Sequence, residues 1–62
     1  MIVVMKRGTS ESTVADMVRR IEDMGLKAHV IQGTERTVIA AVGEKRDGER
    51  ETLESYDEVD QV

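Results

Sequence analysis

The sequence contains no cysteine, proline, tryptophan or phenylalanine, and its only aromatic residue is Tyr56. The absence of cysteine excludes a disulfide framework and any cysteine-based zinc site. His29 is the only histidine, which excludes a His-rich metal site and argues against a Ser-His-Asp triad. A single aromatic side chain also argues against single-stranded nucleic-acid binding, because that binding relies on stacking of bases on aromatic rings.

Positive charge is scarce as well. Nine Lys and Arg residues stand against thirteen Asp and Glu residues, giving a net charge of −4, whereas phosphate backbones are bound by clustered Lys and Arg. No apolar run approaches the ~20 residues that span a bilayer, and residues 1–6 lack the basic lead and cleavage site of a signal peptide. We therefore expect no nucleic-acid partner, no membrane partner and a cytoplasmic location.

The 62 residues suffice for one small domain, 1–62, which buries only about 60% of the surface of its unfolded chain. Apolar runs predict strands at 2–5, 26–32 and 37–42. A stripe of apolar residues at helical spacing predicts a helix over 11–24. The hydroxyl of Thr9 or Ser10 would cap its N-terminus, and Gly25 would end it. A weaker helix is predicted from Glu49 to about Tyr56, followed by a fourth strand that has barely begun at residues 60–62. The apolar stripe of the first helix consists of Val14, Met17, Val18, Ile21 and Met24.

This order predicts an α+β fold of the ferredoxin-like type, a split βαβ (βαββαβ) arrangement. It forms an antiparallel sheet with two helices on one face and a truncated fourth strand. The first and third strands would be central, and both are apolar on both sides. The uncovered face then carries an apolar patch, and such a patch usually marks an interface. The alternative is a sheet face that is merely less polar than average. The apolar face and an exposed edge of the first strand both predict that the chain self-associates, by packing of two faces or by pairing of strands.

His29 and Ile31 are predicted to share one face of the second strand, because side chains alternate along a strand. His29 is either a surface residue that covers apolar neighbours or a hydrogen-bonding group for a ligand on that face. The many carboxylates are most simply a solvated acidic surface, and neither G-x-G-x-x-G nor a Walker motif occurs. No catalytic site can be assembled from these residues, so we expect no activity from the chain alone.

Two segments carry a resemblance to a known family: residues 33–39 read GTERTVI and residues 1–6 read MIVVMK. Both are similar to the N-terminal ferredoxin-like domain of DAHP synthases (3-deoxy-D-arabino-heptulosonate 7-phosphate synthase, or phospho-2-dehydro-3-deoxyheptonate aldolase). The resemblance extends over the whole chain and includes the closing segment 54–62. In that family the fourth strand runs past Val62, so the resemblance implies that the chain is a fragment of a longer one.

The resemblance implies a regulatory, non-catalytic domain. The parent enzyme would carry a TIM barrel with a divalent metal, which would condense phosphoenolpyruvate with erythrose 4-phosphate in the first step of the shikimate pathway. The resemblance implies no cofactor in this domain itself. An aromatic amino acid, phenylalanine or tyrosine, would bind between two such domains and hold them over the barrel. His29 matches an effector-binding His of that family, whereas Ile31 replaces a hydroxyl residue of tyrosine-sensitive relatives, which favours phenylalanine. Asp47 to Glu49 also departs from the apolar residues that relatives carry before the second helix.

Two other functions remain open. The chain could be a freestanding ferredoxin-like interaction module that dimerises through its bare sheet face. An acylphosphatase-like enzyme on the same fold would need an Asn at its substrate, and the sequence has none. The fold alone does not choose among these functions.

Overall fold

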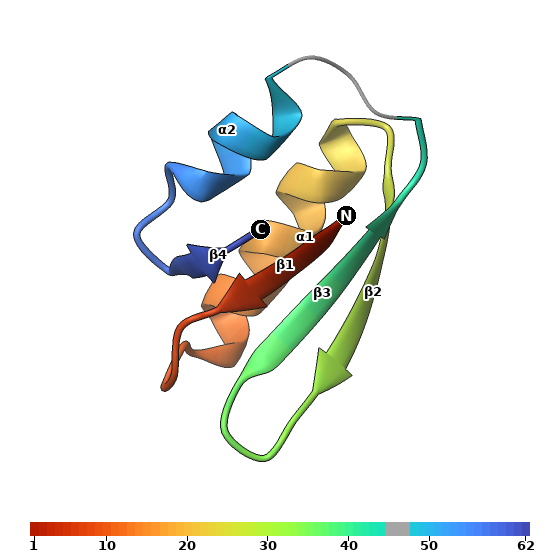
Figure 1. The fold of residues 1–62 in the computed structure, drawn as a ribbon. Coiled ribbons are helices and arrows are strands. Elements are labelled where there is room, and N and C mark those ends of the chain that lie inside the picture. Colours follow the sequence, from red (N-terminus) through yellow and green to blue (C-terminus); the bar gives the residue numbers. More distant parts are fainter. Residues whose placement is uncertain (45–47) are drawn as a thin grey trace.

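The computed structural model describes residues 1–44 and 48–62, which form four strands and two helices (Figure 1). The sequence also predicts a charged loop over residues 44–48. Residues 45–47 of this loop, including the departure at Asp47, lie outside the described residues. The elements along the chain are β1 (Ile2–Met5), α1 (Glu11–Asp23), β2 (Lys27–Gln32), β3 (Thr37–Val42), α2 (Glu49–Glu54) and β4 (Val59–Gln61).

The strands form one antiparallel sheet in the order β2-β3-β1-β4, with β1 and β3 in the centre as predicted. The central pair is in register with Val3 opposite Ile39. The first residue extends this ladder, because Met1 and Ala41 exchange two hydrogen bonds of 2.7 and 2.8 Å. On the other side of β1, Met5 lies opposite Val59, and the ladder shifts register between Val4 and Met5.

Helix α1 begins where the sequence predicts. The Ser10 hydroxyl accepts a hydrogen bond of 3.2 Å from the Thr13 amide, which satisfies one free N–H of the first turn. Val14, Met17 and Ile21 are buried along one side of the helix. The helix ends at Asp23, with Met24 as its cap and Gly25 beyond it at φ +85°, a conformation that glycine adopts without strain.

Helix α2 is shorter than predicted, because it ends at Glu54 and not near Tyr56. The Ser55 hydroxyl donates a 2.6 Å hydrogen bond to the Thr52 carbonyl, and the chain then turns towards β4. Strand β4 begins at Val59, one residue before the predicted fourth strand, and Val59 packs into the core from its place opposite Met5. Leu53 is therefore the only buried apolar residue of α2.

Strand β2 begins at Lys27, one residue later than predicted. Leu26 is instead a buried residue between α1 and β2. Gly43, just after β3, lies against it: a Cβ at position 43 would stand 2.7 Å from Leu26 Cδ2. A side chain at position 43 would displace the Leu26 side chain, and the φ of +152° at this residue also favours glycine.

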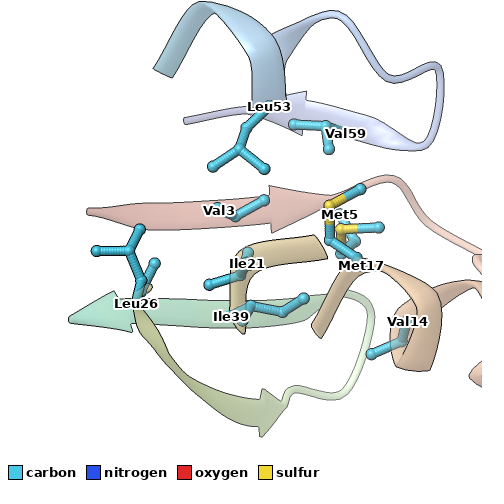
Figure 2. Close-up of a cluster of buried hydrophobic side chains, with 10 residues drawn as sticks. Val3, Met5, Val14, Met17, Ile21, Leu26, Ile39, Leu53 and Val59 are labelled. Carbon is cyan, nitrogen blue, oxygen red and sulfur yellow. The ribbon is translucent and has the colours of Figure 1, made fainter. Parts of the chain in front are cut away.

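The core lies between the helices and one face of the sheet (Figure 2). Figure 2 shows side chains from both helices meeting those of the central strands. No helix among the described residues is long and apolar enough to cross a membrane. The buried apolar residues are Val3, Met5, Val14, Met17, Ile21, Leu26, Ile39, Ala41, Leu53 and Val59.

Candidate functional site

The two faces of the sheet have different surroundings. Directly opposed residues of antiparallel strands point to the same side, so the buried pair Val3 and Ile39 defines the face that the helices cover. The alternate residues of each strand point to the other side, which no described element covers (Figure 1). We call this side the open face. Its residues on β1, β2 and β3 are Ile2, Val4, Lys27, His29, Ile31, Val38, Ala40 and Val42.

On β1, β2 and β3 the open face is apolar apart from two residues of the edge strand β2, His29 and Lys27, the latter opposite Val42. His29 lies opposite Ala40, which in turn lies opposite Ile2, and these three residues form one row across the sheet. Ala40 has only a methyl group, so its larger neighbours Ile2 and His29 stand above it. The side chain of Ile2 is 50% exposed, an uncommon position for a large aliphatic residue in the middle of a sheet.

The next row continues the apolar surface. Ile31 lies opposite Val38, and Val38 lies opposite Val4. Ile31 is 56% exposed, as expected for a residue near the end of an edge strand. His29 and Ile31 thus share the open face at alternate positions of β2, as the sequence predicts.

Val30 shows that exposure depends on the position of a strand in the sheet. It lies opposite the buried Ile39 and so points to the helix-covered side, yet it is 44% exposed. Val30 belongs to the edge strand β2, so no further strand flanks it on one side, whereas Ile39 lies on a central strand and is completely buried. Sequence alternation places Val30 on the correct face but does not reveal this exposure.

Charged groups border the open face at one end. Arg36 precedes β3, and its Nη1 pairs with Oδ2 of Asp60 on β4. Because β1 lies between β3 and β4, this ion pair spans the width of β1. A second pair, Arg7 with Glu35 at 3.3 Å, lies past the ends of β1 and β3 and is more exposed. Sequence analysis found neither pair, although Arg36 stands within the segment that carries the family resemblance.

A shallow hollow of about 110 Å³ lies on the helix side, between α1 and the segment before β4. The Arg20 guanidinium stacks over the Tyr56 ring, 4.5 Å from its centroid. The hydrogen bond and charge interaction with Tyr56 raise the pKa of Arg20. The hollow is lined by Thr13, Asp16, Met17, Arg20, Tyr56 and Glu58.

The remaining chemistry of the described residues is that of a binding surface. Within residues 1–44 and 48–62, no group of three His, Cys, Asp or Glu side chains is placed to hold a metal ion. The most distinctive feature is a largely apolar sheet face that carries His29 and Lys27 on its edge strand and has a charged border at one end. Such a face suits recognition of another apolar surface or of a small amphipathic molecule.

These observations define a ferredoxin-like domain with one helix-covered and one open sheet face. Comparison with known proteins then identifies the family, because residues 1–62 match the DAHP synthase ferredoxin-like domain. The chain belongs to this family, as the resemblance in its sequence indicated.

Relatives of known identity agree with this assignment. Over its full 62 residues the chain is 40% identical to a phospho-2-dehydro-3-deoxyheptonate aldolase of Thermotoga maritima and spans 18% of that protein's length. The crystal structure of phospho-2-dehydro-3-deoxyheptonate aldolase (DAHP synthase) from the same organism superposes on 97% of the chain, with a TM-score of 0.88 and 38% identity. The chain again spans 18% of that structure.

Proposed function

We propose that this chain is the regulatory domain of a DAHP synthase and that regulation acts through its open face. The observation that carries the proposal is an apolar face, with His29 at its margin, that no described helix covers. Family membership supports the link to DAHP synthase. A TIM barrel in the same protein, with its own divalent metal, would then carry out the condensation of phosphoenolpyruvate with erythrose 4-phosphate.

The partner we propose for the open face is a second copy of this domain. Two open faces packed together would remove Ile2, Ile31 and Val42 from water, and these are the most exposed large aliphatic side chains of the described residues. Burial of apolar surface contributes about 25 cal/mol per Å². A domain of this size has little stability to spare, so pairing would also stabilise the fold itself.

The effector we propose is an aromatic amino acid held between the two faces. The ring would lie on the apolar rows, and His29 would offer a hydrogen bond as donor or acceptor. Ile31 places an aliphatic side chain beside His29 on the same strand. A phenol hydroxyl buried against Ile31 would lose its hydrogen bonds to water, so phenylalanine fits this face better than tyrosine.

Feedback inhibition follows from thermodynamic linkage. An effector that binds only the paired domains shifts the equilibrium towards the pair, by an amount fixed by its concentration and affinity. The paired domains would cover the mouth of the catalytic barrel and block substrate entry. The same linkage requires that substrates which need the open enzyme weaken effector binding.

The test uses the full-length protein that contains this domain. Calorimetric titration with phenylalanine and with tyrosine measures binding, and DAHP formation measured in the same samples reports inhibition. We expect phenylalanine to bind more tightly, and we expect His29→Ala to weaken both binding and inhibition. Val30→Ala is the matched control, because Val30 lies on the same strand but points to the other face. If neither amino acid binds while the domains still associate, the chain acts as an interaction module and the effector proposal is wrong.

A further inference from the structure

The ion pair at the border of the open face has the composition of an amino-acid recognition site. Arg36 Nη1 and Asp60 Oδ2 are in contact, and the two side chains are 44% and 40% exposed. Among the described residues neither side chain has a second polar partner. The pair therefore leaves N–H groups of the guanidinium fork and the carboxylate atom Oδ1 available to a ligand.

Apolar side chains adjoin this pair directly. Val38 is two residues beyond Arg36 along the chain and lies opposite Val4, while Val4 lies opposite Gln61, the neighbour of Asp60. Two residues along a strand advance by about 7 Å. A molecule whose charged end meets the ion pair would thus lay its next few carbon atoms over Val38 and Val4.

We propose that Arg36 and Asp60 bind the α-carboxylate and α-ammonium groups of the amino-acid effector. This inference rests on the proposed function, and it adds the residues that recognise the main-chain end of the ligand. A free amino acid carries one positive and one negative group on the same carbon. Arg36 offers a planar fork that matches a carboxylate, and Asp60 offers an acceptor for the ammonium group.

The charge balance supports a zwitterion over a simple anion or cation. The Arg36–Asp60 pair is neutral as a unit, so it neither attracts nor repels a ligand of zero net charge over long distances. An isolated carboxylate would compete with Asp60 for Arg36, and an isolated amine would compete with Arg36 for Asp60. A ligand with both groups can satisfy both residues while their own contact is kept.

The direction of the bound ligand follows from the same geometry. With its charged end at Arg36 and Asp60, the side chain points along β3 towards Ala40 and the row that contains His29. Ala40 is the smallest residue of the open face and leaves room there for a ring. The ring would then lie over Val38 and Ala40, and its edge would face the row that contains His29.

The experiment compares three ligands on the full-length protein by calorimetric titration: phenylalanine, phenethylamine, which lacks the carboxylate, and 3-phenylpropionate, which lacks the ammonium group. We expect each truncated ligand to bind about 10- to 100-fold more weakly than phenylalanine, as is typical for loss of a charge-assisted hydrogen bond. Arg36→Gln should abolish the preference for phenylalanine over phenethylamine. Asp60→Asn should abolish the preference over 3-phenylpropionate.

Two further variants separate recognition from structure. The exchange Arg36→Asp with Asp60→Arg keeps an ion pair across β1 but reverses its direction, so we expect an unchanged melting temperature and at least tenfold weaker binding. Arg7→Gln removes the neighbouring ion pair with Glu35 and should leave all three affinities unchanged. If phenylalanine binds the original protein and the exchanged variant equally, the ion pair only stabilises the fold and does not bind the ligand. The inference is then wrong and the proposed function stands. If neither phenylalanine nor tyrosine binds the original protein, both are wrong.

Discussion

The two faces of the sheet are almost equally apolar in sequence but differ in what covers them. On one side, Val3, Met5 and Ile39 are completely buried beneath the helices. On the other, Ile2 and Val42 of the same central strands remain half exposed. The apolar residues of the first face hold the domain together, whereas those of the second can contribute only when something else covers them.

This difference shows that apolar residues in one sequence pattern can serve two purposes, stability of the fold and binding of a partner. Apolar residues on a central strand predict a covered face, but the pattern does not say what covers it. In this domain the helix-covered face sets the free energy of unfolding, and we expect the open face to set association and ligand affinity. Substitutions on the two faces should therefore affect different measurements.

The largest effect is expected from a pair of matched isoleucine substitutions. Ile39 is fully buried and Ile31 is 56% exposed, on neighbouring strands and opposite faces. Ile39→Ala should lower the free energy of unfolding by about 2–5 kcal/mol because it leaves a cavity, whereas Ile31→Ala should cost well under half of that. Urea unfolding measures both, and Ile39→Val, at about 0.5–1.5 kcal/mol, replaces Ile39→Ala if that variant does not fold. Equal losses at the two positions would contradict the distinction between the faces.

Association should respond to the opposite face. Ile2→Glu places a carboxylate in the middle of the open face, where a paired copy would have to bury it without a partner. We expect the dissociation constant for self-association to rise at least tenfold, as measured by sedimentation equilibrium. The control is Val30→Glu, which introduces the same charge at an exposed position of the helix-covered side. Equal weakening by the two variants would indicate a general charge effect and not an interface at the open face.

A smaller effect is expected where α1 is anchored over the sheet. Ser10→Ala removes the side-chain acceptor of the Thr13 amide and should cost about 1 kcal/mol, whereas Ser10→Gly should cost only a few tenths. Thermal unfolding distinguishes the two. An effect of similar size for both variants would mean that the hydroxyl does not act as the cap.

The smallest effect is expected from an ion pair on the surface of α2. Arg50 Nε lies 2.9 Å from Glu54 Oε1, one helical turn apart, and both side chains are largely exposed. Arg50→Gln should lower the free energy of unfolding by about 0.2–0.5 kcal/mol, and added salt should reduce the difference. A loss above 1 kcal/mol would show that α2 contributes more to the cover of the sheet than its single buried leucine indicates.

The parts of the fold that could be predicted from the sequence are those with local signals. Ser10, a helical apolar stripe and Gly25 together define α1, and alternation places His29 and Ile31 on one face. Position 59 has no such local signal, because a valine there fits both the end of a helical apolar stripe and the start of a strand. Its pairing with Met5, far away in the sequence, decides between them.

The charged border of the open face could not be predicted for a similar reason. Arg36 and Asp60 are 24 residues apart, and no periodicity connects them. The contact exists because β1 lies between β3 and β4 and because the β1–β4 ladder shifts register beside Asp60. Sequence reasoning identified Arg36 only as part of a family segment and gave it no partner.

The brevity of β4 has a consequence for the storage and handling of the isolated 62-residue chain. Two register pairs and the 2.8 Å hydrogen bond from the Lys6 amide to the Glu58 carbonyl hold the strand to β1. Such a short ladder can detach by local opening at far lower free energy than global unfolding, and detachment bares the edge of an apolar central strand. Precipitation of the isolated domain should then follow the rate of this opening, so that aggregation begins well below the melting temperature and amide exchange at Lys6 reports the risk in advance.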